Sequence, residues 1–143
     1  YVQTAVEYTK VKDAGQPRKI TIGARGVAEE PTDEDFANAA VYKITLPSEA
    51  VAKANSLLSI EYQGDCARLY ANGKLIADQF QYGRPFLLGL WRLPEGTTEL
   101  ELRILPLQAD APIYLPKEAD KTPGEGVKKI MRLSLPHNPK VSL

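Results

Sequence analysis

The residues best suited to chemistry lie in one short segment, residues 78–86, which combines aromatic, acidic and basic side chains. A sugar ring presents C–H groups on its faces and hydroxyl groups at its edge, so flat aromatic faces and forked polar groups suit it. If the chain binds carbohydrate, we expect the site here, with Tyr82 as the stacking face and Arg84 as the hydroxyl donor. Asp78 and Trp91 are the further candidate residues of this site.

The same aromatic residues also have a structural interpretation. Phe80, Phe86 and Trp91 stand where large side chains commonly fill the core of a β-sandwich. Arg84 has two other possible partners, the carboxylate of Asp78 or a neighbouring domain. Both interpretations remain open from the sequence.

No arrangement of residues predicts catalysis. The single histidine, His137, lies between prolines near the C-terminus, and the single cysteine, Cys66, has no base beside it in the sequence. Glycosidases need two carboxyl groups held across a cleft, and nothing in the sequence places Asp65, Asp78 or Asp110 opposite one another. We therefore predict no catalytic residue and no cofactor.

Metal binding has one weak candidate. The acidic run Asp33–Glu34–Asp35 offers oxygen atoms of the kind that calcium prefers. Consecutive carboxylates on a loop are more commonly charged surface, and no histidine or cysteine pair has zinc spacing. We predict no metal site.

The charge balance argues against nucleic acid as a partner. Eighteen basic and eighteen acidic residues cancel, whereas affinity for nucleic acid comes from clustered lysine and arginine. The densest basic cluster, Lys128, Lys129 and Arg132, is interpreted as the solvated face of a strand. No apolar run is long enough to cross a membrane.

The elements that position these residues are predicted to be strands. Apolar and polar side chains alternate, as in a strand with one face on a core, over residues 41–46, 58–63, 99–104 and 131–135. Asn72-Gly73, between the predicted strands at residues 67–71 and 74–77, is a strong hairpin signal, because both residues tolerate positive φ. Short helical turns are expected only over residues 33–40 and 47–54. We predict one all-β domain over residues 1–143, an antiparallel β-sandwich or jelly roll of about eight strands.

A family resemblance extends this interpretation. Residues 62–80 include Ala67-Arg68-Leu69-Tyr70, the Asn72-Gly73 turn and Ala77-Asp78. With the continuation over residues 82–86, 102–107 and 110–115, they resemble the C-terminal β-sandwich of bacterial β-galactosidases of glycoside hydrolase family 35. The resemblance covers about residues 56 to 116 and implies a galactose-binding-like fold.

The resemblance also implies a role. Family members hydrolyse β-galactosides with two glutamates on a (β/α)₈ barrel, and such a barrel does not fit in this chain, so the chain is expected not to be an enzyme by itself. Its implied function is that of an ancillary domain that braces the catalytic barrel of the same polypeptide. The alternative is a carbohydrate-binding module for galactose-containing glycans. The implied location is the periplasm or cell surface of a polysaccharide-degrading bacterium, and the start at Tyr1 is interpreted as that of a processed or longer protein.

Overall fold

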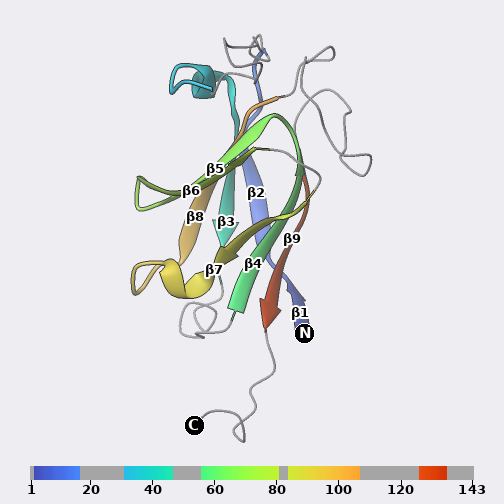
Figure 1. Ribbon diagram of the computed structural model, residues 1–143, viewed down its shortest axis with the longest axis vertical. Helices are drawn as coiled ribbons and strands as arrows, with labels where there is room; N and C mark the ends of the chain where they lie inside the picture. Colours follow the sequence, from blue (N-terminus) through green and yellow to red (C-terminus); the bar gives the residue numbers. More distant parts are fainter. Residues whose placement is uncertain (1, 17–30, 47–55, 81–83, 107–125, 135–143) are drawn as a thin grey trace, which may run out of the picture.

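Two antiparallel β-sheets pack face to face in the computed structural model of the chain (Figure 1). The structure describes residues 2–16, 31–46, 56–80, 84–106 and 126–134. Within these ranges it contains nine strands and two short 3₁₀ helices. The predicted antiparallel β-sandwich is confirmed, with one strand more than the expected eight.

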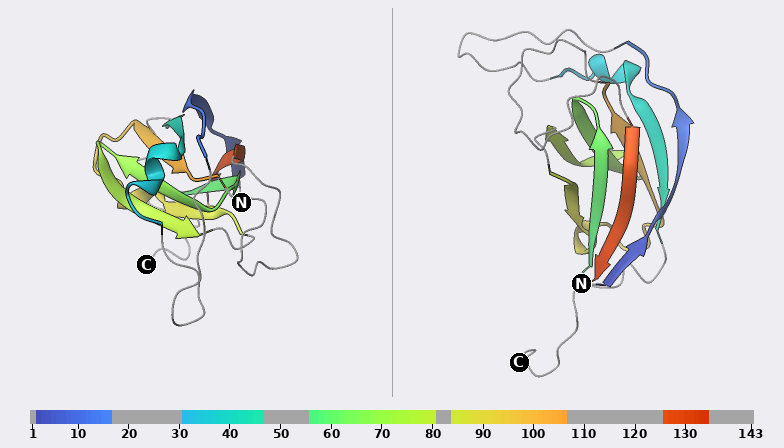
Figure 2. Two further views of the ribbon diagram at one scale, coloured as in Figure 1. Left: turned by 90° about the horizontal axis from the view of Figure 1, so that it is seen from above. Right: turned by 90° about the vertical axis from the view of Figure 1, so that its right-hand side faces the viewer.

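The two sheets have four and five strands (Figure 2). The four-stranded sheet has the order β1 (Val2–Ala5), β9 (Gly126–Ser134), β4 (Ser56–Gln63), β7 (Phe86–Gly89). The five-stranded sheet has the order β2 (Glu7–Lys12), β3 (Ala40–Thr45), β8 (Glu99–Ile104), β5 (Cys66–Ala71), β6 (Lys74–Phe80). The 3₁₀ helices are η1 (Asp35–Asn38) and η2 (Leu90–Arg92).

The hairpin between β5 and β6 turns at Asn72 and Gly73, as predicted. Their φ angles are 52° and 77°, both in the left-handed region that Asn and Gly tolerate best. The two strands pair antiparallel from Ala71 and Lys74 outward. This hairpin places the end of β6 beside the start of β5, at the far end from the turn.

Of the two expected helical turns, one falls within the described residues. It is shorter than predicted, a single turn of four residues over η1. Thr32 and Asp35 bond reciprocally before it: the N–H of Thr32 donates to Oδ2 of Asp35 at 2.7 Å, and the N–H of Asp35 reaches Oγ1 of Thr32 at 3.3 Å. The other turn, over residues 47–54, lies outside the described residues. The described ranges contain no helix that is long and apolar enough to span a membrane.

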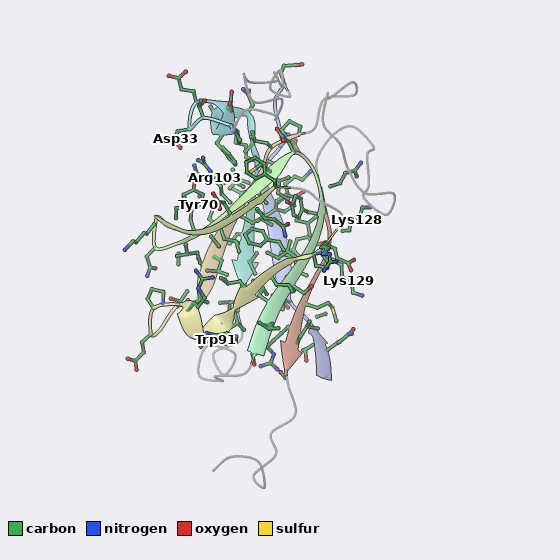
Figure 3. All side chains as sticks on the ribbon, viewed as in Figure 1. Asp33, Tyr70, Trp91, Arg103, Lys128 and Lys129 are labelled. Carbon is green, nitrogen blue, oxygen red and sulfur yellow. The ribbon has the colours of Figure 1, made fainter. Side chains whose placement is uncertain are left out.

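The basic cluster on β9 is not one solvated face. Lys128 and Lys129 are exposed (Figure 3), and a bulge in the pairing with β4 leaves Lys128 as the extra residue. Arg132 is buried, because it lies two residues after Ile130 on the face that meets the core. The prediction that Arg132 belongs to a solvated face is therefore wrong. The alternation over residues 131–135 also indicated the wrong inward face, because Met131 and Leu133 lie on the outer side of the sheet.

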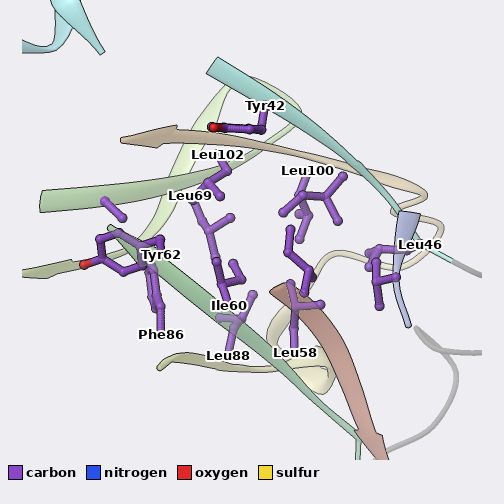
Figure 4. Packing of buried hydrophobic residues seen from close by; sticks show 14 of the residues in the cluster. Tyr42, Leu46, Leu58, Ile60, Tyr62, Leu69, Phe86, Leu88, Leu100 and Leu102 are labelled. Carbon is purple, nitrogen blue, oxygen red and sulfur yellow. The ribbon is translucent and has the colours of Figure 1, made fainter. Parts of the chain in front are cut away.

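The core fills the space between the sheets with alternate residues of both (Figure 4). Leu100 and Leu102 of β8 face Leu58 and Ile60 of β4, and all four side chains are almost fully buried. The predicted inward face of residues 99–104 is confirmed. Packing of this core sets the relative orientation of the two sheets. It therefore also determines which edge strands of the two sheets lie next to each other.

Two tyrosine hydroxyls join the sheets across the core. The hydroxyl of Tyr42 on β3 accepts the N–H of Val127 on β9 at 3.3 Å. The hydroxyl of Tyr62 on β4 donates to the carbonyl oxygen of Gln79 on β6, also at 3.3 Å. Buried tyrosines usually pair their hydroxyls in this way. The second bond holds the end of β6 against the four-stranded sheet, where the predicted site begins.

Candidate functional site

The four predicted site residues do not come together in one place. Asp78 lies exposed near the end of β6, opposite Arg68 of β5. Arg84 is exposed just before β7, and Trp91 lies beyond β7 in η2. Tyr82 lies outside the described residues.

A hollow of about 480 Å³ lies where β6 ends and β7 begins, and it contains one of the predicted residues. Its described lining is made of the last residues of β6 and the first of β7, together with the proline before β7: Asp78, Gln79, Phe80, Pro85, Phe86 and Leu87. Arg84 and Trp91 are not among these residues. The hollow is therefore formed by Asp78 with neighbours that the sequence analysis did not assign to the site.

Gln79 is the structural support of this hollow. Its side-chain Nε2 donates to the carbonyl oxygen of Pro85 at 3.3 Å, and its own carbonyl oxygen accepts the hydroxyl of Tyr62. Because the Pro85 carbonyl can only accept, the amide orientation of Gln79 follows from this bond. Its Oε1 is buried and finds no donor among the described residues. The end of β6 is thus tied both to the approach of β7 and to β4.

Phe80 is at the mouth of the hollow, not in the core. Its side chain is 47% exposed, because Gln79 occupies the inward position beside Ala67 and strand alternation turns Phe80 outward. Phe86, by contrast, is 3% exposed and packs in the core. The core interpretation is confirmed for Phe86 and wrong for Phe80.

The core interpretation is also wrong for Trp91, whose side chain is 53% exposed (Figure 3). Its indole ring lies against the backbone of Gly89 on the outer side of β7. A β-carbon at Gly89 would stand 2.5 Å from Cζ2 of Trp91, so the ring occupies the space that any other side chain would fill. Gly89 therefore permits the observed ring position, a role that no local sequence signal reveals.

Trp91 extends an apolar area on the outer face of the four-stranded sheet. The strand register places Gly89, Leu57 and Leu133 in one row across β7, β4 and β9. The next row contains Leu87, Ser59 and Met131. We call the four large apolar side chains of these rows, together with Trp91, the apolar face; its members are Leu57, Leu87, Met131, Leu133 and Trp91. Leu87 is 51% exposed, and the three on β4 and β9 are half-buried.

The outer face of the five-stranded sheet is charged instead. Lys43 of β3 pairs with Glu99 of β8 at 2.9 Å, and Nε of Arg103 donates to Glu101 at 2.7 Å. The Arg103 guanidinium also lies over the ring of Tyr70, 4.5 Å from its centroid (Figure 3). A groove of about 340 Å³ crosses this face beside Tyr70. Its charged groups are thus already paired with each other.

Two residues of the acidic run at the start of η1, Asp33 and Asp35, make protein contacts. Oδ1 of Asp33 pairs with Nη1 of Arg68 at 2.8 Å, and Asp35 accepts the N–H of Thr32. Burial lowers the pKa of Arg68, but hydrogen bonding and charge interactions with Asp33 and Tyr70 outweigh this and leave the pKa above its usual value. The guanidinium is therefore always charged. Within the described ranges, no three acidic, histidine or cysteine side chains gather as metal ligands would.

The carboxylates considered for glycosidase chemistry do not gather either. Asp65 is buried, 3% exposed, with its backbone N–H bonded to the carbonyl of Leu105. Asp78 is the only acidic residue in the described lining of the hollow. Asp110 lies outside the described residues. The described ranges therefore hold one carboxylate at the hollow rather than the pair that glycoside hydrolysis needs.

Comparison with known proteins assigns no family. No family description and no curated protein matches the chain. Among solved structures, an acetyl xylan esterase from the rumen bacterium Butyrivibrio proteoclasticus is similar over 95% of this chain, with 17% sequence identity and a TM-score of 0.32. The match covers 35% of the esterase, so this chain spans about a third of its length. A similarity of this size carries no conclusion about function.

Proposed function

We propose that the chain is a non-catalytic ancillary domain of a glycoside hydrolase resembling the β-galactosidases of family 35, and that it packs against the catalytic module through the apolar face. The observation that supports this proposal is the position of Trp91 and Leu87, both about half exposed, beside three further apolar side chains in adjacent rows of the sheet. The family assignment itself depends on the sequence resemblance over residues 56 to 116.

The composition of the apolar face favours a protein partner. Exposed apolar residues that occur singly need no explanation, whereas a contiguous group commonly marks an interaction site. Tryptophan is among the residues enriched at the energetic centre of interfaces, and methionine is enriched in interfaces generally. The outer face of the five-stranded sheet carries the ion pairs Lys43–Glu99 and Arg103–Glu101 instead. The contrast between the two outer faces is the reason to place the docking surface on the four-stranded sheet.

The test is a binding experiment in trans. Labelled chain is titrated with the catalytic module encoded in the same polypeptide, and amide shifts are followed by NMR. We expect the shifts to concentrate on β4, β7 and β9, and Trp91→Ala to weaken binding by tenfold or more, as for the truncation of an interface hot spot. Val11→Ala is the matched control, because Val11 is an exposed apolar residue, 64% exposed, on β2 of the other sheet. Shifts confined to the five-stranded sheet, or equal effects of both variants, would contradict the proposal.

A second function, carbohydrate binding, has the hollow at β6 and β7 in its favour. Phe80 and Leu87 present apolar surface there, and Asp78 presents a carboxylate. No basic side chain is part of the described lining, so the chemistry favours a neutral ligand that donates hydroxyl groups, such as a galactose-containing glycan. Phe80 then takes the stacking role predicted for Tyr82, and Asp78 keeps its predicted polar role.

A further inference from the structure

The inner face of the four-stranded sheet carries a buried arginine at one end. Arg132 of β9 lies opposite Leu58 of β4 and Thr4 of β1, on the same face as the core residue Ile130. This is the end of the sandwich at which β4 begins and β9 finishes (Figure 1). The side chain of Arg132 is only 9% exposed. A fixed positive charge therefore sits at the border of the apolar core.

Four buried polar side-chain atoms at this end have no hydrogen-bond partner among the described residues. Nε and Nη1 of Arg132 are both buried and bond to no acceptor there. The hydroxyl oxygens of Ser56 and Ser134 are also buried without a hydrogen bond, and these two serines face each other across β4 and β9. Three side chains that can donate hydrogen bonds thus occupy neighbouring register positions on the inner face, without a described acceptor.

This arrangement fits a carboxylate ligand. A buried charge without a partner is strongly unfavourable, so native structures pair it with an opposite charge or satisfy it with hydrogen bonds. The planar guanidinium offers adjacent N–H groups whose geometry matches the two oxygens of a carboxylate, and serine hydroxyls can donate to the same oxygens. We propose that Arg132, Ser56 and Ser134 form a binding site for a carboxylate group.

The position of the site indicates where the carboxylate comes from. Ser56 and Ser134 are adjacent in sequence to Leu57 and Leu133, which form one row of the apolar face. A module docked on that face would reach this end of the sandwich, and an acidic side chain at its edge would pair with Arg132. The inference that the catalytic module supplies the carboxylate rests on the proposed function. The inference that the ligand is a carboxylate does not. A free small carboxylate is the other source with the same chemistry.

The first experiment uses the chain alone. Arg132→Met removes the charge and keeps an apolar side chain of similar length. We expect it to raise the urea concentration at the unfolding midpoint, because it removes a buried guanidinium whose Nε and Nη1 have no partner among the described residues. The matched control is Arg68→Met, which we expect to lower the midpoint, because Arg68 has Asp33 and the Phe36 ring as partners. An Arg132→Met variant that unfolds as easily as the control would mean that Arg132 is satisfied within the chain, and would overturn the proposal.

The second experiment identifies the ligand and its source. Sodium acetate, with sodium chloride at equal ionic strength as reference, is titrated into wild-type chain while the Nε–Hε signal of Arg132 is followed by NMR. The catalytic module is titrated in the same way. We expect the signal to shift and its exchange with water to slow in at least one titration. A response to acetate alone indicates that the ligand is a free carboxylate, whereas a response to the module indicates a carboxylate supplied by docking. If the module supplies the carboxylate, Arg132→Met weakens its binding by about 30-fold or more.

Failure of the two proposals can be told apart. Trp91→Ala reports on docking, and its effect is independent of any carboxylate. Module binding that depends on Trp91, together with an Arg132 signal that neither acetate nor the module changes, would overturn the carboxylate site and leave docking supported. An acetate effect without module binding would support the site and contradict the docking proposal.

Discussion

The guanidinium carbon of Arg68 lies 4.0 Å from the centroid of the Phe36 ring. The contact joins β5 to η1, an element that lies well before β5 in the sequence. Asp33 adds an ion pair to the same guanidinium, but its carboxylate side chain is 95% exposed. Phe36 itself is buried with Ala39, Cys66 and Leu105 in a small second core. Burial of the ring should therefore contribute more to stability than the ion pair does.

Variants at this contact separate the two contributions. Phe36→Ala should lower the free energy of unfolding by about 3 kcal/mol, the cost of removing a buried aromatic ring. Asp33→Asn should lower it by less than about 1 kcal/mol, because an exposed ion pair is screened by water. Urea unfolding measures both values. A larger loss for Asp33→Asn than for Phe36→Ala would show that the ion pair, not the ring, holds η1 to the sheet.

Gly89→Ala should displace the Trp91 ring without removing it. The new β-carbon would overlap the indole, which stands 2.5 Å from its position, so the ring must move off β7. We expect a change in tryptophan fluorescence emission, which reports on this residue alone since the chain has one tryptophan. Gly96→Ala controls for the change of residue type, because a β-carbon at Gly96 meets no atom within 4 Å, although its positive φ will cost some stability. An unchanged emission spectrum in Gly89→Ala would contradict the stacked position.

Galactose or a galacto-oligosaccharide should perturb the hollow if the second function holds. Exposed sugar sites bind weakly, with a Kd on the order of 1 mM, which corresponds to a binding free energy of about −4 kcal/mol. In an NMR titration we expect shifts on residues 78–80 and 85–87, lost in Phe80→Ala and reduced in Asp78→Asn. Leu75→Ala, on the same strand and 44% exposed but outside the described lining of the hollow, should leave them unchanged. Shifts that persist in Phe80→Ala and vanish in Tyr82→Ala or Arg84→Ala would favour the original sequence prediction instead.

The purified chain should not hydrolyse aryl galactosides or glucosides. The described residues bring one carboxylate, that of Asp78, to the hollow, whereas glycoside hydrolysis uses two. The assay measures release of the aryl group over hours at high protein concentration. Turnover that survives purification and is abolished by Asp78→Asn would place a catalytic site in this chain.

Much of the fold could be predicted from the sequence, because its determinants are local. Alternation at period two identifies the inward residues of β8, Leu100, Leu102 and Ile104, whichever strands lie beside them. Asn72 and Gly73 specify their turn through their own backbone preferences. The sequence alone therefore determined that the chain is a β-sandwich and which face of β8 is buried.

The surfaces were decided by the tertiary structure. Alternation assigns a side chain to one of two sheet faces but does not show what covers that face, which depends on strands far away in the sequence. Trp91 is exposed because Gly89 leaves space for its ring, and Phe80 is exposed because Gln79 takes the inward position. Arg132 is buried because β9 lies between β1 and β4, two strands that the sequence does not place next to it. The apolar face exists only because β7, β4 and β9 are brought side by side in this register.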